Sequence, residues 1–302
     1  QHNKCTPGLW AHDRPSPFTR MVYRASPGRG VAMATIKQLY QDVGFSKLLT
    51  TNQPKLEKSK ALNYFTAGLQ LAPSNLSGFE VCAYACIACI ANCINFAGHG
   101  GIGLDENGLN TAQRARIART RLLFTDPQRF FSILLLEIEA HVRRARKLGM
   151  VPIFRLNVFS DLPWERMLVD GVRTVFQCFP DVQFMDYTKY PIDRRPVEML
   201  PTNYNLTMSL ADTNDSECVR ALHSGRNVAV VFQLNKGEEL PPTFGGFPVV
   251  DGDVHDLRFL DISPAVVGLR VKGHAAIRES RSSERHPFFR SVGEDGFRCA
   301  AY

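Results

Sequence analysis

The sequence predicts an α/β protein built from successive β-α units, arranged either as a partial (β/α) barrel or as an open parallel sheet. Two observations support this fold class. Short apolar runs typical of strands alternate through the middle of the chain with segments whose apolar residues have helical spacing, and strands separated by helices of about 10 to 15 residues are usually parallel. From residue 247 onward the apolar runs have no helices between them, which predicts a few antiparallel strands near the C-terminus.

The first predicted elements are a strand and two helices. A loosely alternating run at 62–71 stops before Pro73 and predicts a strand. Residues 111–124 predict a short basic helix. The next helix begins at Asp126, because an N-cap residue followed by Pro at the first helical position is a strong start signal. Its apolar residues repeat at helical spacing until Gly149 ends it.

The remaining elements alternate in the same way. Apolar runs predict strands at 151–157, 182–187, 204–210 and 227–233, and helices are predicted at 161–176, 194–200 and 215–223. Three further strands are predicted at 247–250, 257–260 and 266–271. In both arrangements of parallel β-α units, ligand sites lie at the carboxyl ends of the strands.

Polar residues at these strand ends are the candidates for an active site. We expect Asp161, Asp186 and Lys189 to be catalytic. The residues expected to contact a cofactor are Asn157, Tyr187, Ser209 and, from a glycine-rich run, Gly100 and Gly101. Strand ends also meet solvent and are polar for that reason alone, so the prediction depends on the set gathering on one rim.

Four of the eight cysteines lie close together, at Cys82, Cys86, Cys89 and Cys93. Soft thiolate ligands on one short loop are typical of iron–sulfur sites. The spacing of the first three resembles the pattern by which radical S-adenosylmethionine enzymes hold three irons of a [4Fe–4S] cluster and leave the fourth iron open for the cofactor. The segment therefore predicts a [4Fe–4S] cluster and S-adenosylmethionine as cofactors.

Two other interpretations of the cysteine segment are open. The four positions also share one face of an α-helix, so the segment could be a buried helix that uses Cys as a small apolar residue. In a continuous helix Cys82 and Cys93 would stand about 16 Å apart along the axis, too far apart for one metal site. Zinc is the second alternative, although structural zinc sites usually join ligand pairs that are distant in sequence.

Composition and charge bound the class of protein. The chain has 302 residues, of which 44% are apolar and 22% charged, and this excludes a mainly disordered or coiled-coil chain. No apolar run approaches the roughly 20 residues of a membrane helix, and no apolar secretion signal stands near the start. We therefore expect a cytoplasmic protein without a membrane partner. The net charge of +7 is compatible with a nucleic acid or nucleotide as partner.

A single α/β domain is expected over residues 33–273. Residues 1–32 are basic, rich in proline and without periodicity, so we expect them to be disordered or a non-native upstream segment. Residues 274–302 are polar and without pattern, which predicts a disordered tail.

Two further groups have both a functional and a structural interpretation. The first could bind a divalent metal and comprises Asp251, Asp253, His255 and Asp256. Because Asp251-Gly252 stands between two apolar runs, a turn is the favoured interpretation. The second group is basic and comprises Arg114, Arg116, Arg119 and Arg121. These arginines could neutralise the phosphates of a nucleic acid, or they could form a solvated helix face.

Several stretches between residues 45 and 273 match a known family pattern. They are KLLTTNQPKL at 47–56, LAP at 71–73, GHGGIGLD at 98–105, RIARTR at 116–121, RLN at 155–157, SD at 160–161, WE at 164–165, FMDYTK at 184–189 and DGDVHDLRFL at 251–260. On these stretches the chain resembles a bacteriophage family related to the phage gene product 88 domain. The resemblance implies a phage-encoded protein of the host cytoplasm and supplies no activity to carry over.

The resemblance also bears on the candidate site. It implies three cysteines, which match Cys82, Cys89 and Cys93 here, so Cys86 is an addition. At 157–159 this chain has Asn-Val-Phe where relatives have a small turn that contains glycine. That departure would alter the rim of the pocket.

Two functions from different classes follow. The first is an iron–sulfur enzyme of radical S-adenosylmethionine type that acts on a nucleotide or nucleic-acid-related substrate and needs an electron donor. The second is a non-enzymatic phage accessory protein that binds nucleic acid or a host protein, with cysteines that are structural or hold zinc. Replacement of Cys82, Cys89 or Cys93 by Ala separates them: the enzyme would lose its cluster and activity and keep its fold, whereas the zinc protein would lose the fold itself.

Overall fold

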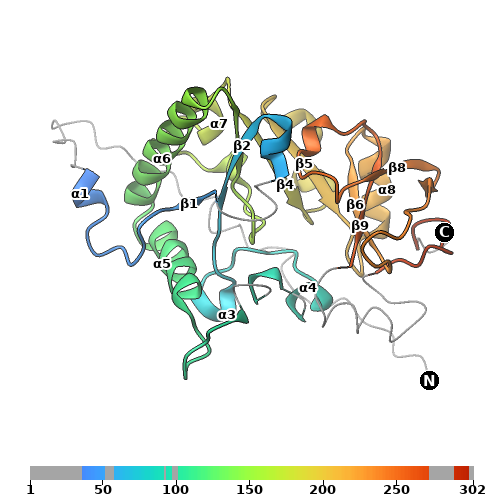
Figure 1. The fold of residues 1–302 in the computed structure, drawn as a ribbon, viewed down its shortest axis with the longest axis horizontal. Coiled ribbons are helices and arrows are strands. Elements are labelled where there is room, and N and C mark those ends of the chain that lie inside the picture. The colour runs from blue at the N-terminus through green and yellow to red at the C-terminus, as the bar shows by residue number, and fades with distance from the viewer. Residues whose placement is uncertain (1–35, 52–57, 92, 97–100, 272–288, 299–302) are drawn as a thin grey trace.

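The computed structural model describes residues 36–51, 58–91, 93–96, 101–271 and 289–298 (Figure 1). Its strands form one nine-stranded sheet in the order β1-β2-β3-β4-β5-β6-β9-β8-β7. The strands are β1 (Leu49–Thr50), β2 (Tyr64–Leu69), β3 (Val151–Arg155), β4 (Gln183–Thr188), β5 (Tyr204–Ser209), β6 (Val228–Phe232), β7 (Thr243–Phe244), β8 (Phe247–Asp251) and β9 (Val266–Arg270).

The strand directions confirm the predicted α/β class. Neighbours from β2 through β6 to β9 and β8 are parallel, whereas β1 on β2 and β7 on β8 are antiparallel. The order β2 to β6 follows the chain, as it does in a (β/α) barrel or partial barrel. The carboxyl ends of these strands therefore meet at one edge of the sheet, which is where a ligand site is expected.

Helices and 3-10 turns connect most of the strands along the chain. The α-helices are α1 (Ile36–Leu39), α3 (Ser74–Ser77), α4 (Ile87–Ala91), α5 (Thr111–Thr125), α6 (Pro127–Lys147), α7 (Val175–Cys178) and α8 (Asp215–His223). The 3-10 turns are η2 (Lys58–Leu62), η3 (Ile94–Phe96), η5 (Trp164–Arg166), η6 (Ile192–Arg194), η7 (Val197–Met199) and η8 (Arg258–Leu260). In Figure 1, α5 and α6 lie beside β2, and α8 lies next to β6. No helix of the described residues is both long enough and apolar enough to span a bilayer.

The main core lies between α6 and the strands next to it. Phe130, Ile133 and Ile138 on α6 are fully buried and belong to one apolar cluster with Phe154 of β3 and Phe184 of β4. The last two residues are also partners in the β3–β4 register. Burial of such side chains is the main favourable contribution to folding.

The predicted start of α6 is confirmed in detail. The Asp126 N–H donates to the carbonyl of Leu122 and ends α5, while its carboxylate accepts the N–H of Arg129 at 3.2 Å and begins α6. Pro127 stands at the first helical position, and Gly149, at φ 65°, follows the helix. One carboxylate thus organises the corner between two long helices.

Three of the predicted elements are wrong. The helix expected at 161–176 is replaced by an irregular segment with only η5 and the start of α7. The strand expected at 257–260 is the turn η8, and Leu257, which precedes it, packs with Ile153 and Met185. The helix expected at 194–200 is divided into the two turns η6 and η7, since Pro196 interrupts it.

Part of the predicted tail is folded. The main chain of Arg290 forms a bridge with Phe232 of β6, and its guanidinium donates to both carboxylate oxygens of Asp215 at 2.8 and 2.9 Å. The ring of Phe297 packs edge-on against Phe244 at 5.0 Å. Residues 289–298 therefore belong to the body of the protein, while 1–32 lie outside the described residues.

Candidate functional site at the carboxyl edge of the sheet

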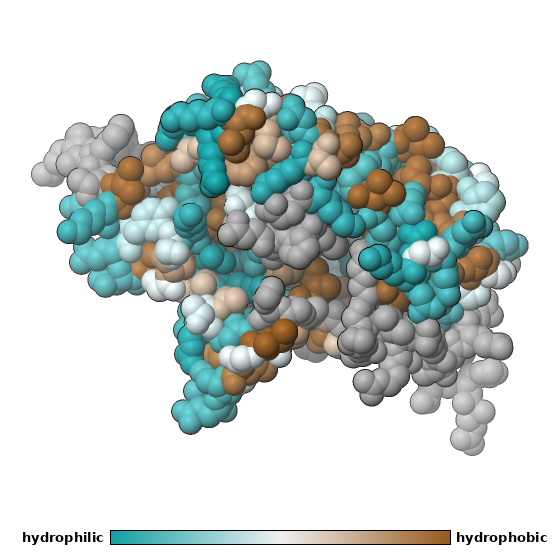
Figure 2. Space-filling view, in the orientation of Figure 1, coloured by the Kyte–Doolittle hydropathy of each residue, from teal (hydrophilic) through white to brown (hydrophobic). Residues whose placement is uncertain are grey.

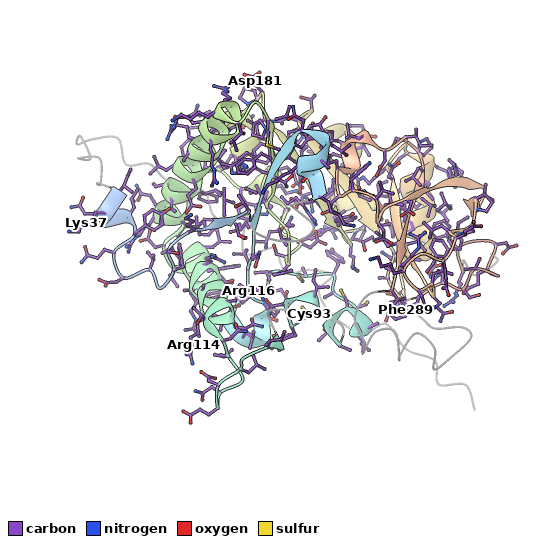
Figure 3. All side chains as sticks on the ribbon, in the orientation of Figure 1. Lys37, Cys93, Arg114, Arg116, Asp181 and Phe289 are labelled. Carbon is purple, nitrogen blue, oxygen red and sulfur yellow. The ribbon has the colours of Figure 1, made fainter. Side chains whose placement is uncertain are left out.

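The cysteine loop, defined here as residues 81–96, follows β2 and lies against the segment that follows β3. The Asp161 N–H donates to the carbonyl of Val81 at 2.7 Å, and the Cys82 thiol donates to the carbonyl of Phe159 at 3.7 Å. Figure 3 shows Cys93 close to Arg116 of α5. The loop thus covers the carboxyl ends of the first parallel strands.

A buried arginine holds the far end of the cysteine loop. Arg116 donates from Nε to Gln70 at 3.1 Å and from Nη1 to the carbonyl of Asn95 at 2.8 Å. Its guanidinium also lies 4.6 Å from the centre of the Phe159 ring. The sequence predicts Arg116 as part of a basic surface, but the structure places it inside, between the ends of β2 and β3.

The cysteine loop is not one helix. Among its described residues, 81–91 and 93–96, the only α-helical part is α4, which covers Ile87–Ala91, and turns precede it. Ile87 and Ile90 of that helix are 84% and 65% exposed. The hypothesis of a buried cysteine helix is therefore wrong, because the segment is neither continuously helical nor buried on its apolar side.

All four thiols are partly buried, and none of them forms a disulfide. The Cys89 N–H donates to the Cys86 sulfur at 3.3 Å. The hydrogen bond between their side chains is the largest cause of two opposite shifts, since it raises the pKa of Cys86 and lowers the pKa of Cys89. Burial opposes the second shift, and the Lys189 ammonium adds to it. Burial raises the pKa of Cys82 and of Cys93.

Three of the predicted rim residues meet beside these thiols. Lys189 donates from Nζ to Ser209 Oγ at 3.2 Å and from its main-chain N–H to the Asp161 carboxylate at 2.7 Å. The same ammonium lowers the pKa of Cys89, so the two side chains are close. Asp161 also pairs with buried Arg195 at 3.1 Å, and burial raises the pKa of Asp161 while Arg195 lowers it. The ends of β4 and β5 and the loop after β3 therefore converge on the cysteine loop.

Two other predicted residues, Asp186 and Asn157, are buried and hydrogen-bond to main-chain groups. Asp186 is fully buried and accepts the N–H groups of Leu156 and Asn157 at 3.2 and 2.8 Å, and burial raises its pKa to about 7. Asn157 is buried as well, and its Oδ1 accepts from Leu162 N and from Trp164 Nε1. Both side chains thus shape the loop after β3.

Tyr187 belongs to the opposite face of the sheet from its neighbour Asp186, because consecutive strand residues alternate. Its hydroxyl donates to Asp256 at 3.4 Å, and the Arg155 guanidinium lies 5.2 Å from its ring centre. Gly101 would place an added Cβ only 2.5 Å from the carbonyl of Phe96, so a close approach requires glycine there. Gly100 lies outside the described residues.

Sequence reasoning missed Arg195, which orders this side of the rim. Its guanidinium is fully buried and donates to both oxygens of Glu165, at 2.9 and 2.7 Å, and to Thr188 at 3.2 Å. Its position in a short proline-flanked segment gives no local signal of that role. The network ties the segment after β3 to the end of β4.

The acidic group at 251–256 forms a turn with internal ion pairs. Asp251 and Asp253 both pair with Arg270, at 2.9 and 3.3 Å, and Asp256 pairs with Arg155. Among the described residues, no three His, Cys, Asp or Glu side chains lie close enough together to hold a metal ion. The turn interpretation accounts for these carboxylates.

The geometry defines an α/β protein with a cysteine-bearing loop over the carboxyl edge of a mainly parallel sheet. A family model for gene product 88 matches residues 44–286. The chain therefore belongs to the phage gene product 88 family, as its sequence predicts. No curated protein and no solved structure matches it.

Proposed function

We propose that this protein is an iron–sulfur enzyme of radical S-adenosylmethionine type that acts on a nucleotide or nucleic-acid-related substrate. One observation carries the proposal: the cysteine loop follows the first parallel strand, and its Cys89 thiol lies within the electrostatic influence of Lys189, which follows β4. This edge is where α/β proteins bind their ligands. Lys189, Ser209 and Asp161 supply the polar groups that a substrate or cofactor would meet there.

The donor set consists of soft sulfur ligands, the type that holds an iron–sulfur cluster. Cys82 interacts electrostatically with Cys89 and Cys93, and Cys86 bonds to Cys89, so all four thiols share one region. Zinc requires four ligands at about 2.0 to 2.3 Å from one centre. In a cubane cluster each thiolate binds a different iron, so the thiols stand farther apart.

The residues have distinct roles under this proposal. Cys82, Cys89 and Cys93 would hold three irons, and Cys86 stands beside Cys89 as a further thiol. When bound, the cluster and S-adenosylmethionine supply a one-electron cleavage that yields a carbon radical, for which an external electron donor is needed. The hydrogen bond from Cys86 and, after it, the Lys189 ammonium lower the pKa of Cys89, and both favour the thiolate form that would bind metal. Asp161 fixes the Lys189 backbone, and Ser209 orients its ammonium.

The test is the metal content of the full chain purified without oxygen. We expect about four irons and four sulfides per chain, with broad absorption near roughly 400 nm from a thiolate-held cluster. Cys89→Ser should lose iron and colour and keep the fold. Cys178→Ser is the matched control, because Cys178 is partly buried on α7 and outside the loop. One zinc without colour, or no metal after reconstitution with iron and sulfide, would refute the cluster.

A second candidate is an accessory protein that binds nucleic acid without chemistry. A groove lined by arginines along α5 favours it. In that case iron would be absent while binding to nucleic acid persists. The metal content and a binding assay on the same preparation therefore separate the two functions.

A further inference from the structure

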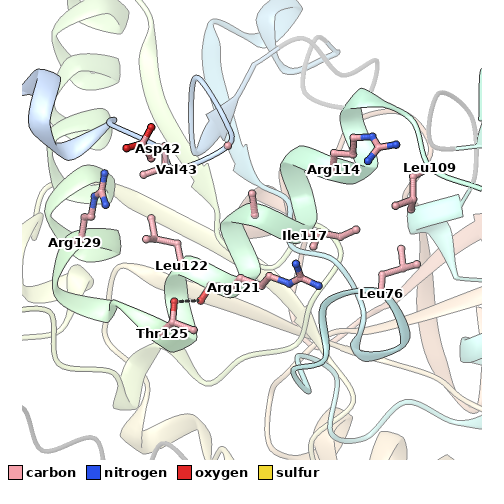
Figure 4. A pocket seen from close by; sticks show the side chains of 12 residues that line it. Asp42, Val43, Leu76, Leu109, Arg114, Ile117, Arg121, Leu122, Thr125 and Arg129 are labelled. Carbon is pink, nitrogen blue, oxygen red and sulfur yellow. Dashed lines mark hydrogen bonds between the residues drawn. The ribbon is translucent and has the colours of Figure 1, made fainter. Parts of the chain in front are cut away.

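The groove lies on the side of α5 away from the cysteine loop. It has a volume of about 590 Å³ and runs between α5, the turn at residues 42–44 and the region of α3 (Figure 4). Figure 2 shows hydrophilic residues gathered on the segment that projects before α5. Volumes of this size are typical of ligand pockets.

Arginines dominate the charge of the groove. Arg114, Arg121 and Arg129 line it, and Asp42 is its only acidic lining residue among those the structure describes. Figure 4 shows Arg114 and Arg121 on α5 and Arg129 at the other end, next to Asp42. The local field therefore favours an anion.

The three arginines differ in how firmly they are held. Arg129 donates from Nε to the carbonyl of Leu39 at 2.9 Å, so its charge is fixed at one end. Within the part of the chain that the structure describes, the Arg121 guanidinium donates one long hydrogen bond, to the carbonyl of Ser77 at 3.4 Å. Arg114 is 54% exposed and pairs with solvent-exposed Asp105, and exposed pairs of this kind contribute little. Arg114 and Arg121 can thus turn to a ligand at small cost.

Their spacing suggests a polymer. Arg114 and Arg121 are seven residues apart on one helix, which places them about 10.5 Å apart along the axis, and Arg129 follows on the next helix. This spacing fits successive phosphates of one strand better than a single phosphate. The aliphatic side chains of Ile117 and Leu122 lie on the same wall and offer an apolar surface to bases.

We propose that this groove binds a single strand of nucleic acid through its phosphates. Guanidinium groups form paired hydrogen bonds to phosphate oxygens, and phosphate neutralisation is the main source of affinity for nucleic acids. The inference that the groove holds the substrate of an enzyme rests on the proposed function. The inference that the groove binds nucleic acid does not depend on that function.

The test is fluorescence anisotropy of a labelled single-stranded oligonucleotide of about 16 nucleotides, titrated with full-length protein over a series of salt concentrations. The doubly substituted Arg114→Gln/Arg121→Gln protein should bind about tenfold more weakly or worse. The slope of log affinity against log salt should fall by about 1.4, since each lost phosphate contact on a single strand removes about 0.7. The control is Arg143→Gln/Arg146→Gln, an equal change of charge at exposed positions of α6 outside the groove.

Three results would overturn the groove: no binding by the wild type, an equal loss in the control, or equally tight binding of a poly-glutamate peptide through the same arginines. If circular dichroism shows that the double variant does not fold, the single variant Arg114→Gln replaces it in the test, and the slope of log affinity against log salt should change by about 0.7. Iron measured in each preparation separates the two proposals. If the protein contains iron but does not bind the oligonucleotide, only the proposed nucleic-acid groove is refuted. If it binds the oligonucleotide but contains no iron, only the proposed cluster is refuted.

Discussion

Helix α6 and the cysteine loop differ in the source of the contacts that stabilise them. Helix α6 buries an apolar face against β3 and β4, with Phe154 and Phe184 in one cluster beneath it. The cysteine loop exposes the apolar side chains of α4 and is held by polar contacts to distant segments, such as Asp161 to Val81. The first region should therefore dominate stability, and the second should be free to change with function.

The largest effect should come from the apolar layer. Phe154→Ala removes a fully buried ring that packs 5.0 Å from His141 and 5.6 Å from Phe184. We expect the free energy of unfolding to fall by about 3 to 5 kcal/mol. Ile87→Ala, at an 84% exposed position of α4, should change it by less than about 0.5 kcal/mol. Urea unfolding measures both, and equal losses would contradict the comparison.

The next effect concerns Asp186, which holds the main chain at the start of the loop after β3. Burial raises its pKa to about 7, whereas the unfolded chain has a value of about 3.9. The folded state thus binds the proton more tightly, so the contribution of Asp186 to stability is complete below about pH 4 and is lost as the pH rises through about 7. Between pH 5 and 8 the loss should be about 2 to 3 kcal/mol.

Asp186→Asn isolates that contribution from other titrating groups. The amide can still accept the N–H of Asn157, but it does not ionise. We expect the difference in unfolding free energy between pH 5 and pH 8 to shrink by the amount above. An unchanged pH profile would show that Asp186 is ionised throughout and is held by its backbone donors.

A smaller effect should come from the corner between the two long helices. Asp126→Ala removes the cap at the start of α6, and we expect a loss of about 1 kcal/mol in the free energy of unfolding. Asp126→Asn should retain most of that stability, because its side-chain oxygen still accepts the N–H of Arg129. Thermal unfolding compares the three proteins, and equal loss in both variants would point to charge rather than capping.

The difference between local signals and contacts to distant segments also explains which elements the sequence predicts correctly. The signals of α6, Asp126-Pro127 at its start and Gly149 after its end, are local, and the structure has them in place. The helix expected at 161–176 fails because the Asp161 carboxylate is committed to Lys189 and Arg195, which lie 28 and 34 residues away. No local pattern contains those partners.

The candidate site was predictable from the sequence only in part. The rule that sites form at strand ends correctly brings together Lys189, Ser209 and Asp161. It could not separate Asp186 from Tyr187, since neighbouring strand residues point to opposite faces and only the paired strands decide which face is which. Nor could it place Arg116, whose charge predicts a surface position and whose partners, Gln70 and Asn95, bury it.

A small effect on stability, and the sharpest effect on chemistry, should come from Lys189→Met. Lys189 lies at the edge of the core, so the free energy of unfolding should change by less than about 1 kcal/mol. The Cys89 thiol loses a neighbouring ammonium, which raises its pKa, and its alkylation by iodoacetamide in metal-free protein should require higher pH. Lys189→Arg, which keeps the charge, should retain most of the wild-type profile, and Cys178 should react alike in all three proteins. If Cys89 alkylation has the same pH dependence in Lys189→Met as in the wild type, the bond from Cys86 alone accounts for the low pKa, and Lys189 is left with its contact to Ser209.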